Sequence, residues 1–248
     1  MKLNRTTGKA AGAGVGVIAT LLLALTFIVG NDQVDTLPAL EPPTTTAPVS
    51  GAATPTHEPT PITSGSPAAA MLAEISTATE APEDPYDRDL FGQRWADVDR
   101  NGCDTRNDML ARDLVDPTFK AGTHDCVVLT GTLHDPYTGE TVTFTRVSEG
   151  YQPVQVDHII SLDAAWATGA AEWNDQKRLQ FANDPLNLLI TTANQSKGER
   201  TPSSWMPATP HAACYYATRY VEVAHTYELA LAAADIDALS AALTGCTQ

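Results

Sequence analysis

A small group of polar side chains in the second half of the sequence could together act on a phosphodiester. Asp157 and His158 are adjacent in a short β-branched segment, and Asn187, Asn194 and Lys197 follow further along the chain. Carboxylate and amide oxygens are ligands of a hydrated divalent ion such as Mg²⁺, which needs few protein ligands. Imidazole titrates near neutral pH and can accept a proton from water. This combination fits phosphodiester hydrolysis assisted by a metal ion.

The order of elements around these residues is strand, helices, strand and then a short helix or turn. A strand alternates its faces, so Asp157 and His158 point to opposite sides unless the backbone bends there. We expect Asn187 to open the second strand, to accept a hydrogen bond from the imidazole and to hold its orientation. Lys197, followed by Gly198, would contact phosphate or stabilise its loop.

The first thirty residues have the pattern of an export segment. Residues 1–9 carry Lys2, Arg5 and Lys9 and no acid, and residues 10–30 have no charged side chain. A basic region followed by an apolar stretch is typical of a signal peptide, and this stretch is also long enough to be an uncleaved signal anchor. Both alternatives place the remaining chain outside the cytoplasm, and membrane contact is expected only through this segment.

Composition divides the remaining chain into two parts. Residues 31–85 are rich in Pro, Thr, Ala and Ser and have few large apolar side chains, which predicts a disordered spacer with a candidate short helix at residues 69–79. Residues 86–248 form the predicted folded domain, and their length is sufficient for one hydrophobic core.

Four cysteines fit an oxidising location. They allow three pairings, of which proximity in sequence favours Cys103–Cys126 and Cys214–Cys246. Free buried thiols are the alternative. A zinc site is not expected, because the sequence has no Cys-x-x-Cys pair.

The net charge of −15 argues against a large non-specific surface for nucleic acid. Basic residues do lie close to the polar group, namely Lys177, Arg178, Lys197 and Arg200. A bound cation would also offset local negative charge. A nucleic-acid substrate therefore remains compatible with the composition.

A second polar cluster precedes the predicted helix 107–114. Asp97, Asp99, Asn101 and Asp108 follow the spacing of a calcium-binding loop, with Asp in place of the final Glu. The alternative is a polar turn held by Cys103. Calcium is thus a candidate second cofactor beside Mg²⁺ or Mn²⁺, and no small-molecule cofactor is expected.

The flanking segments predict an α+β fold. Residues 126–133 and 140–147 are strand-like and are joined by a Pro- and Gly-containing loop, which indicates a hairpin. The chain from residue 211 onward is rich in alanine and has helical periodicity. We expect a disulfide-stabilised domain with an N-terminal hairpin and C-terminal helices around the strands that carry the polar group.

The motifs around the polar group resemble the HNH endonuclease superfamily with its ββα-metal core, and more closely its secreted HNH-like branch related to the C-terminal domain of GmrSD-type restriction enzymes. The resemblance rests on three segments: Asp157-His158-Ile159-Ile160-Ser161-Leu162, Phe181-Ala182-Asn183-Asp184-Pro185-Leu186-Asn187-Leu188 and Asn194-Gln195-Ser196-Lys197-Gly198. It extends to Tyr86-Asp87-Arg88 and Cys103-Asp104-Thr105-Arg106-Asn107, and covers the whole predicted domain.

The resemblance implies a role for each matched residue. His158 matches the general base that activates water, Asp157 and Asn194 match metal ligands, and Asn187 matches the asparagine that orients the base. The last HNH position is Asn194 rather than histidine, so Mg²⁺ or Mn²⁺ is expected rather than zinc. Arg106 is a candidate phosphate ligand, with a buried structural ion pair as the alternative.

Two functions follow as hypotheses. The first is an exported metal-dependent endonuclease, acting on DNA in preference to RNA, with His158 as the base. The second is a non-catalytic, calcium-binding or envelope-associated module that keeps the fold. Metal-dependent hydrolysis distinguishes them.

Overall fold

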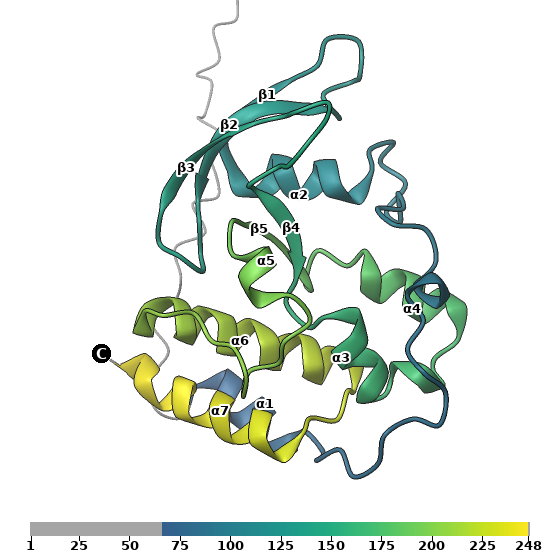
Figure 1. The fold of residues 1–248 in the computed structure, drawn as a ribbon, viewed down its shortest axis with the longest axis vertical. Coiled ribbons are helices and arrows are strands. Elements are labelled where there is room, and N and C mark those ends of the chain that lie inside the picture. Colours follow the sequence, from purple (N-terminus) through teal and green to yellow (C-terminus); the bar gives the residue numbers. More distant parts are fainter. Residues whose placement is uncertain (1–65, 248) are drawn as a thin grey trace, which may run out of the picture. The chain divides into compact units, whose positions relative to one another are not determined.

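Residues 66–247, which the computed structural model describes, form two antiparallel sheets with helices packed around them (Figure 1). One sheet has the strand order β1-β2-β3 and the other pairs β4 with β5. The strands are β1 (Leu114–Phe119), β2 (Val128–His134), β3 (Thr141–Thr145), β4 (Gln155–His158) and β5 (Leu188–Thr191). The α-helices are α1 (Pro67–Glu74), α2 (Thr105–Asp113), α3 (Leu162–Ala167), α4 (Asp175–Ala182), α5 (Asn194–Lys197), α6 (Pro210–Tyr227) and α7 (Ala233–Thr244), and the 3₁₀ helices are η1 (Arg88–Phe91), η2 (Ala170–Glu172) and η3 (Gly245–Thr247). The fold class is therefore α+β, as the sequence predicts.

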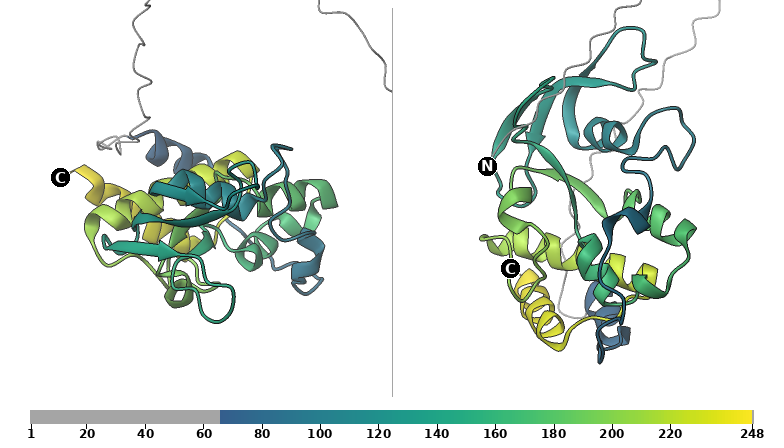
Figure 2. Two further views of the ribbon diagram at one scale, coloured as in Figure 1. Left: turned by 90° about the horizontal axis from the view of Figure 1, so that it is seen from above. Right: turned by 45° about the vertical axis from the view of Figure 1, so that its right-hand side comes forward.

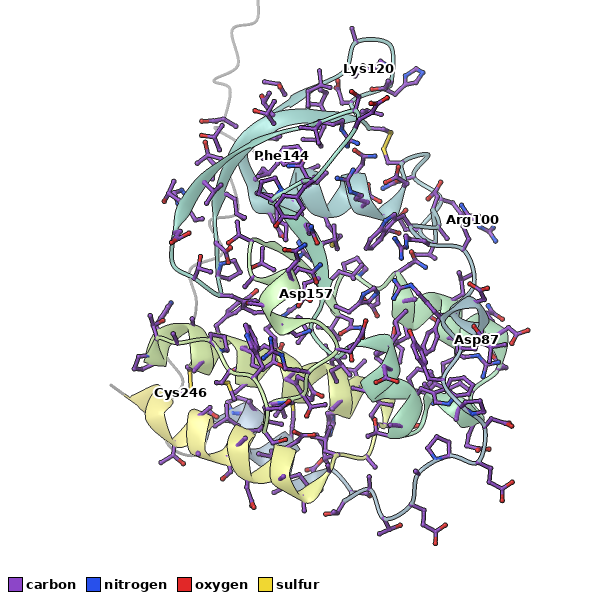
Figure 3. All side chains as sticks on the ribbon, in the orientation of Figure 1. Asp87, Arg100, Lys120, Phe144, Asp157 and Cys246 are labelled. Atoms are coloured by element: carbon purple, nitrogen blue, oxygen red, sulfur yellow. A yellow bond between two sulfur atoms is a disulfide. The ribbon has the colours of Figure 1, made fainter. Side chains whose placement is uncertain are left out.

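The β4–β5 pair lies between two hydrophobic cores. Leu188 and Ile190 belong to a cluster with α2 and the three-stranded sheet, whereas Leu189 packs among the helices. This is the alternation expected of a strand, and each of these three side chains is at most 1% exposed. Burial of a Leu or Ile side chain contributes about 2 kcal/mol, so packing on both faces holds this pair of strands rigidly. Figure 3 shows Asp157, on β4, between the sheet that carries Phe144 and the helical end that carries Cys246.

The start of β5 and the end of β4 are fixed by register and by helix caps. His158 pairs with Leu188 and Asp157 with Leu189. Ser161 follows directly, and its hydroxyl accepts a hydrogen bond from the backbone N–H of Ala164, which begins α3. The catalytic candidates therefore lie where a strand gives way to a helix.

Helix α1 extends the folded part of the chain beyond the domain start predicted at residue 86. It lies within the predicted spacer, yet Ala68 and Leu72 are buried among the helices. Thr77 also forms a bridge with Leu231. Figure 2 shows α1 beside α7 from two further directions. Composition suggested too few large side chains for order here, but small alanines allow α1 to pack closely against its neighbours.

Strand β1 follows α2 directly and contains Pro117. Pro117 within it argues against a strand, because proline cannot donate to a sheet ladder. The pairing with β2 shifts register between Val115 and Thr118, and Asp116 there has a φ of 50°. A bulge at the edge of the sheet thus accommodates the proline.

The N-terminal segments predicted from composition lie largely outside this description. The predicted export segment, residues 1–30, falls outside residues 66–247, as does most of the predicted spacer. Within the described range, no helix has the length and apolar character needed to cross a membrane.

Asp135 joins the two sheets, and its carboxylate is 2% exposed. It accepts hydrogen bonds from the backbone N–H of Thr192 at 2.7 Å, from the hydroxyls of Thr191 and Thr192, and from the backbone N–H of Tyr137. Burial alone raises the pKa of Asp135, but these hydrogen bonds outweigh burial and hold the pKa below its ordinary value.

Replacing Asp135 by Asn is expected to lower the free energy of unfolding by about 3 kcal/mol, because amide hydrogens would face buried donors. The pKa of Asp135 is lower in the folded than in the unfolded protein. The stabilisation from its ionised carboxylate is therefore complete above the unfolded pKa near 3.9 and is lost as pH falls through the folded pKa. Denaturant titrations at pH 7 and at low pH measure both effects. Asp125→Asn, at an exposed position, is the matched control. An equal loss of stability in the two variants would contradict the prediction.

Candidate active site

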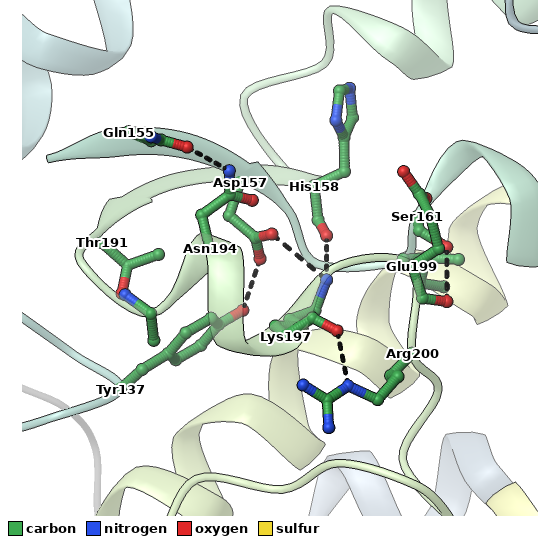
Figure 4. A network of polar contacts seen from close by, with 12 residues as sticks. Tyr137, Gln155, Asp157, His158, Ser161, Thr191, Asn194, Lys197, Glu199 and Arg200 are labelled. Atoms are coloured by element: carbon green, nitrogen blue, oxygen red, sulfur yellow. Dashed lines mark hydrogen bonds and ion pairs between the residues drawn. The ribbon is translucent and has the colours of Figure 1, made fainter. Parts of the chain in front are cut away.

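Asp157 and His158 both line a pocket of about 610 Å³, although they are neighbours on one strand. Their position at the end of β4 allows this, because the chain turns toward α3 directly afterwards. In Figure 4 the imidazole of His158 projects away from the network around the Asp157 carboxylate. The two side chains thus reach one pocket from different directions, consistent with a bend at the strand end.

The Asp157 carboxylate is buried against a lysine. Its Oδ1 is 3.2 Å from the ammonium Nζ of Lys197, and its Oδ2 accepts a hydrogen bond from the hydroxyl of Tyr137 at 3.4 Å. Lys197 is fully buried and also donates to the backbone oxygen of His158 at 2.7 Å. Burial raises the pKa of Asp157 to about 6, against the lowering effect of Lys197 and Tyr137.

Lys197 is the last residue of α5, the short helix that follows β5 and positions the lysine. Gly198 ends the helix with a φ of 55°, a conformation that side chains rarely adopt. The Lys197 side chain reaches beyond its own loop and connects α5 to β4. Contact between Lys197 and phosphate stays a prediction.

His158 has the hydrogen-bonding pattern of a neutral imidazole. Its Nε2 lies 2.9 Å from the backbone oxygen of Ala182, and a carbonyl can only accept, so Nε2 carries the hydrogen and Nδ1 keeps its lone pair. Burial is the largest of the effects that lower the pKa of His158 to about 4; the nearby cations Arg88, Lys197 and Arg94 act in the same direction, and the hydrogen bond to Ala182 opposes them. The ring of Trp95 lies nearly parallel to the imidazole, at 12° and 6.0 Å between centroids.

Asn187 does not contact the imidazole, so the expectation that it accepts a hydrogen bond from that ring is corrected. Its Oδ1 accepts from the backbone N–H of Ile160 at 2.9 Å, and its Nδ2 donates to the Ile160 oxygen at 3.1 Å. The reason is the register of the two strands. His158 pairs with Leu188, so Asn187, which precedes Leu188, lies opposite the residue that follows His158. Asn187 therefore fixes the backbone that follows the base.

Asn194 lies at the first position of α5 and lines the same pocket as Asp157. Its Nδ2 donates to the Gln155 side-chain oxygen at 2.6 Å, which orients the amide and leaves Oδ1 as an oxygen donor. In the described part of the chain, no group of three or more His, Cys, Asp or Glu side chains could hold a metal. The donor set here is one carboxylate and one amide, which fits an ion such as Mg²⁺ that keeps several waters.

Several arginines that line the pocket belong to segments far in sequence from Asp157 and His158. Arg106, the predicted phosphate ligand, lines it together with Arg88 and Arg94. Burial lowers the pKa of Arg106, and the neighbouring Arg146 adds to this effect. Neither residue 88 nor residue 94 was singled out by sequence reasoning, although Arg88 lies in a segment that carries the family resemblance.

The polar loop before α2 makes the contacts of a turn. Asp97 accepts hydrogen bonds from the backbone N–H groups of Asn101 and Gly102, and Asp99 accepts from Asn101. The Asn101 amide also donates to Asp108 at 3.1 Å. These local bonds are those of the polar turn that was the alternative to a calcium loop.

Two disulfides join the pairs that sequence proximity favours. Cys103 is bonded to Cys126, and Cys214 to Cys246. The first connects the polar loop to the start of β2, and the second connects α6 to η3 at the end of α7. These two bonds include all four cysteines of the sequence.

The fold and the pocket together define an α+β domain with a histidine, a carboxylate and two amides arranged on a strand pair and the helix after it. A model of the family described as GmrSD restriction endonucleases, C-terminal domain, matches residues 104–242. The chain is 34% identical over 200 residues to an "Uncharacterized secreted protein" of Arthroderma benhamiae, a match that covers 78% of this chain and 93% of that protein. No solved structure matches significantly. The chain therefore belongs to the family of GmrSD C-terminal domains, as its motifs indicate.

Proposed function

We propose that this protein is an exported, metal-dependent endonuclease with a ββα-metal core formed by β4, β5 and α5. The observation that carries the proposal is the lining of one pocket, where His158, Asp157 and Asn194 lie together with several arginines. Membership of a restriction-endonuclease family supports the nuclease assignment. The two disulfides and the secreted relative support a location outside the cytoplasm.

In the proposed reaction, His158 is the general base. Its Nδ1 accepts the proton of the attacking water, while its Nε2 stays hydrogen-bonded to the Ala182 oxygen, which holds the ring in orientation. Asn187 positions the base indirectly, by fixing the backbone at Ile160. Because the ring is neutral near pH 7, it is ready to take a proton without first losing one.

The remaining side chains of the site bind the metal ion or the phosphate, or position a metal ligand. Asp157 and Asn194 are the proposed ligands of Mg²⁺ or Mn²⁺, and such an ion, when bound, neutralises charge on the phosphate and stabilises the leaving 3′ oxygen. Lys197 keeps the Asp157 carboxylate in place through the contact at 3.2 Å. Arg106, in the same pocket lining, is the proposed phosphate ligand. Because the 3′ oxygen is the leaving group, hydrolysis leaves a 5′-phosphate on the other product.

The non-catalytic alternative is a module that keeps this fold and binds calcium through the Asp97 loop. The Asp97 carboxylate already accepts hydrogen bonds from backbone N–H groups of its own loop. No observation therefore favours the calcium-binding alternative over the nuclease. Calcium-dependent stability without any hydrolysis of nucleic acid would support it.

Removal of the metal tests the proposal directly. The oxidised protein is incubated with supercoiled plasmid, linear DNA and RNA in Mg²⁺, in Mn²⁺ and in EDTA, and the products are separated on gels. We expect nicking in either metal and none in EDTA, with activity restored when metal is added in excess. Cleavage that continues undiminished in EDTA would contradict the metal-dependent mechanism, and folded protein that cleaves nothing in any metal would contradict the nuclease.

A further inference from the structure

His158 lies where two hollows of the surface meet. The pocket of about 610 Å³ and a neighbouring one of about 200 Å³ share Arg88, Arg94, Trp95 and His158 in their linings. The surface is therefore hollowed on two sides of His158. This geometry suits the interior of a polymer chain better than its end.

Two of the arginines that line this site, Arg94 and Arg106, are not engaged in hydrogen bonds or salt bridges within the described residues. In contrast, Arg112, Arg178 and Arg219 are bonded to backbone oxygens. Free guanidinium groups suit phosphate oxygens. With a net charge of −15 on the chain, however, such local contacts cannot follow a long duplex backbone.

An exposed aromatic ring lies in the same lining. Tyr151, in the loop between β3 and β4, is 57% exposed, more than any other large apolar side chain in the described range. Trp95 adds a second, half-buried ring beside the base. Aromatic rings next to cations are the usual means of binding unpaired nucleotides, because every base has a face that can stack.

We propose that the substrate is unpaired at the site: a base next to the scissile phosphate stacks on Tyr151, while Arg94 and Arg106 hold the flanking phosphates. This inference rests on the proposed nuclease function and names its substrate class, single-stranded or locally unpaired nucleic acid. In a duplex, neighbouring base pairs cover both faces of each base, so Tyr151 has nothing to stack on unless the nucleotide is turned out. Glu199 also lines the pocket and, by repulsion, directs phosphates toward the arginines.

The experiment compares one labelled oligonucleotide as a single strand and as its duplex. Cleavage is measured in Mg²⁺, and binding is measured separately by fluorescence anisotropy in EDTA. The variants are Tyr151→Ala and Tyr151→Phe, with Val115→Ala as an exposed apolar control on β1. Tyr151→Ala is expected to weaken single-strand binding about tenfold, and both Tyr151→Phe and Val115→Ala to leave it unchanged. The duplex is expected to be cleaved at least about tenfold more slowly.

The possible results separate this inference from the function on which it rests. If the duplex is cleaved as fast as the single strand and Tyr151→Ala changes nothing, the inference is overturned and the nuclease stands. If nothing is cleaved, the proposed function fails, and the binding measurement then decides the inference by itself. Equal binding of the two forms, or equal binding by Tyr151→Ala and the parent protein, would overturn it.

Discussion

His158→Ala is expected to slow cleavage of nucleic acid by about 10²–10⁴-fold, the range that general-base catalysis contributes. The imidazole can take a proton from water, because Nε2 donates its hydrogen to the Ala182 oxygen and Nδ1 is unprotonated. Stability should change little. The ring is half-buried, and its loss leaves one backbone oxygen without this partner, at a cost of about 1 kcal/mol.

The measurement is the initial rate of cleavage at saturating metal, together with a thermal unfolding curve for each protein. His211→Ala, on the exposed start of α6, is the control for loss of an imidazole elsewhere. Added imidazole should restore part of the activity of His158→Ala, because a free base can enter the space left by the side chain. A variant that folds and cleaves at the parent rate would remove His158 from the role of base.

The part of the site that could be predicted is local in the sequence. Asp157 and His158 are neighbours, and Asn194 follows the strand that pairs with theirs. The hydrophobic pattern and the motif spacing are enough to indicate these elements. The predicted contact of Asn187 was wrong, because it depends on the register of β4 against β5, which periodicity does not define.

The rest of the site comes from distant segments. Trp95, Arg94 and Tyr137 reach the pocket region through packing of the N-terminal loop and the β2–β3 hairpin, and nothing in their own neighbourhoods indicates this destination. Trp95 also has a φ of 56°. This backbone conformation is unusual for a bulky residue and cannot be predicted from the sequence. Motif resemblance signals such residues only where, as with Arg88, they lie in a matched segment.

The same reasoning applies to the fold. Helix α2 and the β2–β3 hairpin follow from capping and turn signals, since Asp104 caps the helix and the loop contains Pro136 and Gly139. Helix α1 overlaps the short helix that residues 69–79 suggest, but its order depends on contacts with α6 and α7 far along the chain. Tertiary packing overrides a composition that, taken alone, predicts disorder.

Lys197→Met is expected to lower the free energy of unfolding by about 3–5 kcal/mol, the usual cost of removing one partner of a buried ion pair. Lys197 is 0% exposed and Asp157 is 2% exposed, so neither charge can turn to water when the other is removed. Methionine has nearly the same length and keeps the packing, which isolates the loss of charge. Without Lys197 the pKa of Asp157 rises further, because a lowering influence disappears.

Denaturant unfolding of Lys197→Met, Asp157→Asn and the double variant separates the ion pair from its surroundings. We expect the double variant to be more stable than Lys197→Met, because the uncompensated carboxylate is gone and the two substitutions couple. Lys120→Met, at an exposed position, should change stability by less than about 0.5 kcal/mol. If Lys197→Met unfolds like the parent protein, the pair does not stabilise the fold. The burial of Lys197 would then have to be explained by its contact with the backbone oxygen of His158, and loss of activity without loss of stability would place its role in positioning the base.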